Sequence, residues 1–130
     1  MSLDVPTALL ERAESGPIDD AEFVACVRES LPYAWTVVNE VVAELRGSGH
    51  ESAEHNRTPP SDAEWGQLFR AFASDSIHGA LERHFNVKLA FQNCCRVAAF
   101  VPDAVDGPAY RHFVSPRAQV LNQSAELRSC

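Results

Sequence analysis

The stretch Ser61–Phe85, SDAEWGQLFRAFASDSIHGALERHF, decides how the rest of the chain is interpreted. On a wheel of about 100° per residue its apolar residues fall on one broad face, which predicts a single amphipathic helix over residues 62–85. Ser61 and Glu64 form a capping box at the start of this helix, and Asn86 suits a left-handed stop after it. The residues of the apolar face are Trp65, Leu68, Phe69, Phe72, Ala73, Ile77, Ala80 and Leu81.

Three polar residues, Ser76, Arg83 and His84, share that apolar face. Polar groups directed at a core are costly unless they are paired, so these three are the main ligand-binding candidates. In one interpretation Arg83 pairs with a carboxylate and His84 caps the last carbonyls of the helix. In the other, Arg83 holds an anionic group of a ligand in a helical pocket.

Weaker site candidates lie on the opposite face of the same helix, where Asp75, His78 and Glu82 recur at helical spacing. This face is predicted to meet solvent, and one interpretation is simply a hydrated helix surface. The other is a general base with its orienting group, because a carboxylate and a histidine three residues apart can interact.

Cys94 and Cys95 are further weak candidates, at a predicted turn where alternation sends their side chains to opposite faces. They either pack as small hydrophobes or, beside a cation such as Arg96, supply a reactive thiolate. All four cysteines, Cys26 and Cys130 included, are expected to be reduced thiols, and their spacing matches no zinc site. We therefore expect no metal and no cofactor.

The segments before the long helix are also expected to be mainly helical, beginning with a short helix that ends near Gly16. Residues 19–46 carry two apolar stripes that keep one angular phase across Pro32. This match favours one helix kinked at Pro32, with a clean break as the alternative. Residues 47–60 are polar and aperiodic, which predicts a flexible surface loop. Its His50 and His55 either bind a metal weakly or face water.

After the long helix the period changes to two. Residues 87–92 and 95–101 predict a β-hairpin with its turn near Asn93. Two strands alone are marginally stable, so they must pack on helices or join strands of another subunit. Prolines then predict short helices over residues 109–113 and 117–122. The expected fold is mostly α with a small β-hairpin (α+β), in a single domain over residues 1–130.

Composition limits the function classes. The chain has 130 residues, 45% of them hydrophobic, and a formal net charge of -7. Nucleic acid is not an expected partner, because phosphate binding needs a basic face, whereas a cationic peptide or a basic protein surface fits the charge. No stretch is apolar enough to predict a membrane span, and the start of the chain lacks a signal-peptide pattern. A cytoplasmic protein is the expectation.

Several stretches resemble a family of small actinobacterial proteins, of about 130 residues, whose function is unknown. They are LPYAW at 31–35, TPP at 58–60 and GQLFRAFASDSIHGALERHFNVKLAFQNCCRVAAF at 66–100. The resemblance extends from MSLDV at 1–5 to SPRAQVLNQ at 115–123. It implies a bacterial cytoplasmic protein and carries no activity with it.

Two hypotheses of function follow. The first is a homodimeric helical binding or assembly protein with a pocket for a partner or ligand, because the sheet is small and no catalytic motif is present. The alternative is a cofactor-independent accessory enzyme that acts on a peptide or small molecule, for example in natural-product maturation. Such an enzyme needs no recognisable motif.

Overall fold

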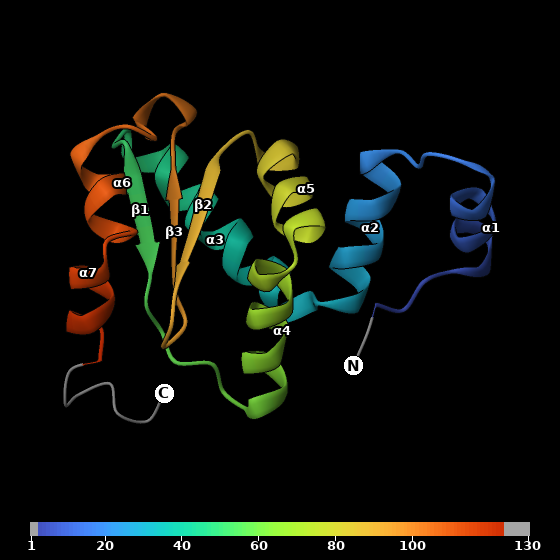
Figure 1. Ribbon diagram of the computed structural model, residues 1–130, viewed down its shortest axis with the longest axis horizontal. Helices are drawn as coiled ribbons and strands as arrows, with labels where there is room; N and C mark the ends of the chain where they lie inside the picture. Colours follow the sequence, from blue (N-terminus) through green and yellow to red (C-terminus); the bar gives the residue numbers. More distant parts are fainter. Residues whose placement is uncertain (1–2, 124–130) are drawn as a thin grey trace.

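The computed structural model describes residues 3–123, which form a mostly helical α+β fold with a three-stranded antiparallel sheet (Figure 1). This confirms the fold class expected from the sequence. The elements are α1 (Thr7–Ser15), α2 (Asp20–Ser30), α3 (Pro32–Ser48), β1 (Ser52–His55), α4 (Asp62–Ala73), α5 (Asp75–Phe85), β2 (Lys88–Gln92), β3 (Arg96–Phe100), the 3-10 turn η1 (Pro102–Ala104), α6 (Pro108–Phe113) and α7 (Pro116–Leu121).

The expected single helix over residues 62–85 is wrong, because the chain breaks at Ser74 into α4 and α5. Ser74 has extended backbone angles, φ -92° and ψ 115°. Its hydroxyl accepts a hydrogen bond from the backbone N–H of Ile77 at 3.4 Å, so Ser74 is the N-cap of a new helix. The following Asp75 adds the negative charge that favours a helix start. This Ser-Asp pair was the signal in the sequence for the break.

At Pro32 the chain also breaks cleanly, which decides between the two alternatives for residues 19–46. Leu31 lies outside helical geometry, with φ -127° and ψ 61°, and Pro32 occupies the first turn of α3. The side-chain oxygen of Gln67 accepts the backbone N–H groups of Tyr33 at 2.7 Å and Ala34 at 3.2 Å. A residue of α4 therefore caps the start of α3 and fixes the two helices to each other.

The sheet has the strand order β1-β3-β2, with both pairs antiparallel. The expected hairpin is β2 and β3, joined at Asn93–Cys95, and its central register pairs Ala90 with Ala98. The third strand was not expected, because β1 lies inside residues 47–60, where the sequence predicted a loop. Its four residues are too few to show alternation, and their pairing with β3 is not a local feature of the sequence.

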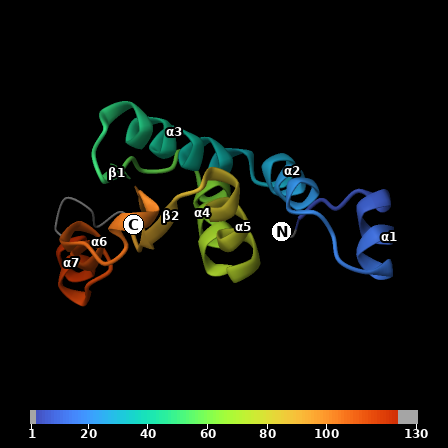
Figure 2. The ribbon, with the colours of Figure 1, turned by 90° about the horizontal axis from the view of Figure 1, so that it is seen from above.

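Helices cover both faces of the sheet (Figure 2). α3 crosses one face and, with α4 and α5, which lie beside β2, encloses the main core. α6 and α7 cover the opposite face, where Phe113 packs with Phe100, Ala90 and Ala98 in a second cluster. The tail helices expected near residues 109–113 and 117–122 are confirmed within two residues at each end.

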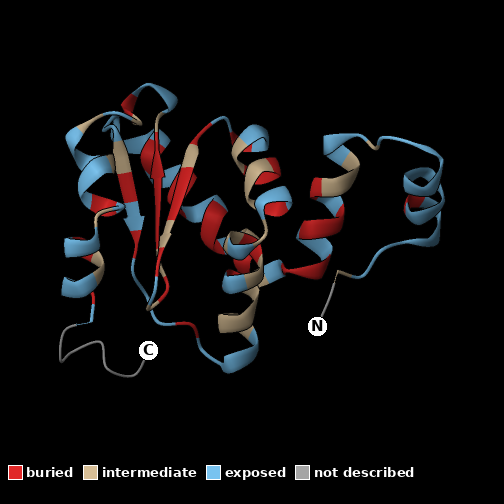
Figure 3. Cartoon of the chain, in the orientation of Figure 1, coloured by how far each residue is buried: buried red, intermediate tan, exposed pale blue. Residues whose placement is uncertain are grey.

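α1 and α2 extend away from the sheet (Figures 1 and 2). α2 packs against α5 and α3, whereas α1 buries only Leu9 (Figure 3). An ion pair of 3.0 Å between Arg12 and Glu22 links α1 to α2. Within residues 3–123 no helix is both long and apolar enough to cross a membrane.

Candidate functional site

Arg83, the first of the predicted ligand-binding residues, forms a bidentate pair with Asp20 at the start of α2. Its Nε lies 2.6 Å from Oδ2 and its Nη2 lies 3.1 Å from Oδ1. The hydrogen bond lowers the pKa of Asp20 and raises the pKa of Arg83. Both side chains are more than half exposed, so the pair links α2 to α5 at the surface and not inside the core. This matches the interpretation in which Arg83 pairs with a carboxylate.

Ser76 lies beside this pair. It is exposed, and its hydroxyl lies 3.0 Å from the hydroxyl of Ser74. A hollow of about 250 Å³ brings Ser76 and Arg83 together with Ile18, Asp20 and Phe23. The structure thus places both predicted residues at one hollow, but the guanidinium there is already neutralised by Asp20.

His84, the third predicted residue, lies in a different hollow, where α2, α3 and α5 meet. Its ring centroid is 5.4 Å from that of Trp35, at a tilt of 53°. The guanidinium carbon of Arg28 lies 5.5 Å from the Trp35 ring centroid. We call this the Trp35 hollow; it has a volume of about 230 Å³. It is lined by Ala21, Val24, Ala25, Arg28, Glu29, Trp35 and His84. Arg28, which lies on the exposed face of α2, was not among the residues predicted from the sequence.

His78 and Glu82 are not on a freely hydrated helix face, because that face of α5 meets β2. The carboxylate of Glu82 accepts the backbone N–H of Leu89 at 2.8 Å, and the His78 ring lies 2.8 Å from the Leu89 carbonyl oxygen. Glu82 also lies 3.4 Å from Lys88 and 3.5 Å from His78. These side chains therefore bind the strand. Asp75 stays exposed in the first turn of α5, away from them.

The turn between β2 and β3 holds Cys94 and Cys95, both in left-handed geometry with φ of 65° and 61°. Cys94 is disulfide-bonded, so the expectation of a reduced thiol is wrong there, whereas Cys26 and Cys95 are free. Cys130 lies outside the described residues. Burial raises the pKa of the Cys95 thiol to about 11. A thiol of this kind is almost entirely protonated at neutral pH and is a poor nucleophile.

His55 is buried at the end of β1, not in a hydrated loop. Its Nε2 lies 3.7 Å from Glu40, which is also 3.9 Å from Arg57. Burial, followed by the charge of Arg57, lowers the pKa of His55. In the described part of the chain its Nδ1 has no hydrogen-bond partner. Over residues 3–123 no group of His, Cys, Asp and Glu side chains could hold a metal ion, and exposed His50 joins none.

Four aromatic rings form a continuous surface over α4 and β2, which we call the aromatic surface: Trp65, Phe69, Phe72 and Phe91. Neighbouring ring centroids are 4.9 to 5.4 Å apart, and Phe72 stacks on Phe91 at 4°. Phe69 is 36% exposed and the other three rings are half-buried. The sequence placed the α4 rings in a core. Leu68 and Ala71 are the buried residues of α4, Trp65 and Phe72 pack against the core from its edge, and Phe69 departs from the prediction.

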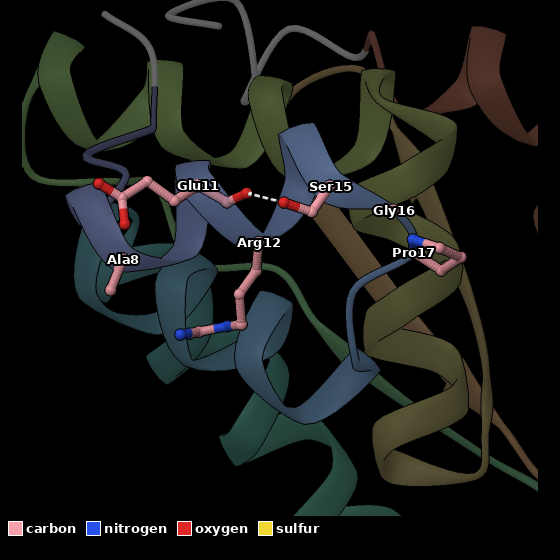
Figure 4. Close-up of a pocket in the computed structure, with 6 residues that line it drawn as sticks. All are labelled: Ala8, Glu11, Arg12, Ser15, Gly16 and Pro17. Carbon is pink, nitrogen blue, oxygen red and sulfur yellow. Dashed lines mark hydrogen bonds between the residues drawn. The ribbon is translucent and has the colours of Figure 1, made fainter.

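A larger hollow, of about 460 Å³, lies along the end of α1 (Figure 4). All six of its lining residues come from one helix and the turn after it, Ala8 to Pro17. The hydroxyl of Ser15 is already bonded to the Glu11 carbonyl oxygen at 3.0 Å, and Arg12 is paired with Glu22. No set of unpaired chemical groups converges there, so size alone does not make it a site.

Comparison with known proteins identifies one family. The model for the family described as NucS shadow ORF, whose name also carries the letters KH, matches residues 1–130. No curated protein and no solved structure matches the chain. Because the match covers the entire sequence, the chain belongs to the NucS shadow ORF family.

Proposed function

We propose that this protein is a binding and assembly module that forms a homodimer through the aromatic surface. The observation that carries the proposal is the exposed position of Phe69 between Trp65 and Phe91. Aromatic residues contribute strongly to protein interfaces, because they bury a large area with few rotatable bonds. A set of rings in mutual contact, with Phe69 exposed among them, is therefore a surface that a partner could cover.

The two apolar sides of α4 support this proposal. One side packs Leu68 and Ala71 into the core. The other carries Trp65, Phe69 and Phe72 at helical spacing, and only part of their area is covered by the chain itself. A helix that is apolar on more than one side is usually buried on more than one side, so α4 has the pattern of an interface helix.

Charge along α4 favours a second copy as the occupant. Asp62 and Glu64 lie in its first turn and Arg70 in its last. Two α4 helices that cross antiparallel about a two-fold axis would bring the acidic end of each toward the basic end of the other. The same patch would then face itself, as a two-fold interface requires.

The alternative, a cofactor-independent enzyme, gains less support from the geometry. The thiol of Cys95 is buried, with its pKa raised to about 11. His78 and Glu82 both bind Leu89. Arg83 is neutralised by Asp20. The groups that could act as nucleophile, base or anion clamp are therefore engaged in holding the fold.

The letters KH in the family name would suggest binding of single-stranded nucleic acid. KH domains clamp the nucleic-acid backbone with a GxxG loop. In this sequence no two glycines are three residues apart, and the α4–α5 junction reads Ala73-Ser74-Asp75-Ser76. With a net charge of -7 as well, nucleic-acid binding is not the function that we propose.

An actinobacterial origin and a cytoplasmic location belong to the same proposal. The disulfide at Cys94 argues against the cytoplasmic part of this proposal, because disulfides persist mainly in oxidising compartments. Native mass spectrometry of the protein isolated from its own source would report the subunit number, any retained ligand and the redox state of Cys94 together.

The direct test is the mass of the full chain in solution, measured by light scattering after size exclusion. We expect a dimer for the wild type and a monomer for Phe69→Glu, with the circular dichroism spectrum unchanged. Val120→Glu is the matched control, because Val120 is 70% exposed on α7, away from α4, and this variant should stay dimeric. A monomeric wild type, or a dimeric Phe69→Glu variant, would overturn the proposal. A monomer would direct the search to a cationic peptide.

A further inference from the structure

We propose that the Trp35 hollow is a binding site for a carboxylate group, held by Arg28 and His84 beside the Trp35 indole. The hollow lies at the junction of α2, α3 and α5, apart from the aromatic surface on α4 and β2. The proposal stands on different residues from the proposed dimer interface and does not depend on it.

Arg28 supplies the charge for this site. Its guanidinium carbon is 5.5 Å from the centroid of the Trp35 ring, an arrangement in which the cation lies over the π face. Such a contact uses the face of the guanidinium and leaves the N–H donors at its edge available for a carboxylate. Among residues 3–123, no carboxylate lies within ion-pair distance of Arg28. Arg83, by contrast, forms a bidentate ion pair with Asp20.

His84 supplies a second polar group from α5. Its ring is exposed, with its centroid 5.4 Å from that of Trp35, and none of residues 3–123 forms a hydrogen bond with its nitrogens. Trp35 also contacts Phe85, at 5.2 Å between ring centroids, which restrains the indole. A rigid aromatic residue with one polar side chain from each of two other helices is a preformed arrangement, which lowers the entropic cost of binding.

The rest of the lining sets the size and character of the ligand. Ala21, Val24 and Ala25 contribute an apolar wall from α2. The volume of about 230 Å³ is below the range typical of drug-sized ligands, so the hollow suits a carboxylate with a short apolar body. A small organic acid and the C-terminal residue of a peptide share this chemistry.

Glu29 provides a second test of the proposal, in which a substitution should strengthen carboxylate binding and not weaken it. Its side chain lines the same hollow as Arg28 and carries the charge of the proposed ligand. Like charges disfavour each other, so Glu29 should weaken carboxylate binding. Neutralising Arg28 and neutralising Glu29 should then change the affinity in opposite directions, and a charge-matched variant far from the hollow separates this local effect from a general change of net charge.

The experiment is a titration of the full-length protein followed by NMR, with the indole N–H signal of Trp35 as the readout. The probes are acetate, benzoate, and a short peptide with either a free or an amidated C-terminus, each against sodium chloride of equal ionic strength. We expect saturable shifts with the carboxylates and none with chloride or the amidated peptide. Tighter binding of the free-acid peptide than of benzoate would identify a peptide C-terminus, and the reverse order a small acid.

The variants decide the outcome. Arg28→Gln should weaken binding roughly tenfold, because it removes a charge-assisted hydrogen bond. Glu29→Gln should strengthen binding several-fold. Arg117→Gln is the matched control, an equal loss of charge on exposed α7, and should change nothing. Equal affinity in the wild type and Arg28→Gln would overturn the proposal, as would the same shift with chloride. If Arg28→Gln alters the spectrum widely, His84→Ala gives a second test from α5, since it removes the other proposed donor and should also weaken binding.

Discussion

α4 and α5 are adjacent in the sequence and share one apolar phase, yet their side chains differ in whether the rest of the chain contacts them. α5 directs its polar side chains to neighbouring parts of the same chain: Arg83 to Asp20, and His78 and Glu82 to Leu89. α4 instead leaves Phe69 exposed beside other aromatic rings. Polar residues at unusual positions can thus be explained by the fold itself, whereas exposed rings remain the stronger indication of a partner.

The largest expected effect separates the two sides of α4. Leu68→Ala should reduce the free energy of unfolding by about 2–5 kcal/mol, because Leu68 is completely buried and its loss leaves a cavity. Phe69→Ala, its immediate neighbour, should cost much less in stability while it weakens the dimer. Urea denaturation of both variants at the same protein concentration would compare their free energies of unfolding. Equal losses of stability would mean that both sides of α4 serve the core.

The next effect concerns the contact of α5 with β2. Glu82→Ala should lower the free energy of unfolding by about 1–3 kcal/mol, because the N–H of Leu89 loses its acceptor in a partly buried place. Glu44→Ala is a suitable control, since Glu44 is exposed on α3. Hydrogen exchange of the Leu89 amide would locate the change. An unaltered exchange rate would show that Glu82 does not hold the strand in solution.

Alkaline pH should produce a moderate effect through Cys95. Its pKa rises from 9.0 to about 11 on burial, so the protonated thiol is favoured by the folded state. The stabilisation is complete below pH 9 and is lost as the pH rises toward 11. By pH 10 the free energy of unfolding should have fallen by about 1 kcal/mol. Cys95→Ala should show a weaker loss of stability between pH 8 and pH 10 than the wild type. Parallel pH curves would contradict this assignment.

The smallest effect is expected at the Arg83–Asp20 pair. Arg83→Met should fold and lose little stability, because both partners are largely exposed and the ion pair is screened by solvent and salt. A thermal melt at low and high ionic strength would measure the difference, which should shrink as salt is added. Unfolding of the variant would show that this pair holds α2 against α5 and would reverse the contrast between the two helices.

Those parts of the fold that carry local signals could be predicted from the sequence. Alternation identified β2, the apolar run after the turn identified β3, and prolines identified α6 and α7. β1 depends on pairing with a strand more than 40 residues away, so its four residues carry no local pattern that predicts a strand. The break at Ser74 did have a local signal, but the continuous apolar phase concealed it.

The candidate site could be predicted only in part from a helical wheel that treats residues 62–85 as one helix. It identified His84 and Arg83, which lie in the last turn of α5. Arg28 could not be identified in this way, since its relation to Trp35 depends on how α2 meets α3 across Leu31. The same wheel placed all three α4 rings in the core, and Phe69 is the one that departs from this, since Trp65 and Phe72 pack partly against the core.

The attachment of Glu82 and His78 to Leu89 also limits how far the sheet can extend. Unpaired backbone groups at the outer side of a strand are a template on which another chain can add a strand, and repeated addition leads to fibrils. Here side chains from α5 already occupy both the N–H and the carbonyl oxygen of Leu89. An incoming strand would have to displace both before it could pair along β2. The protein therefore protects this side of its sheet against polymerisation without a fourth strand.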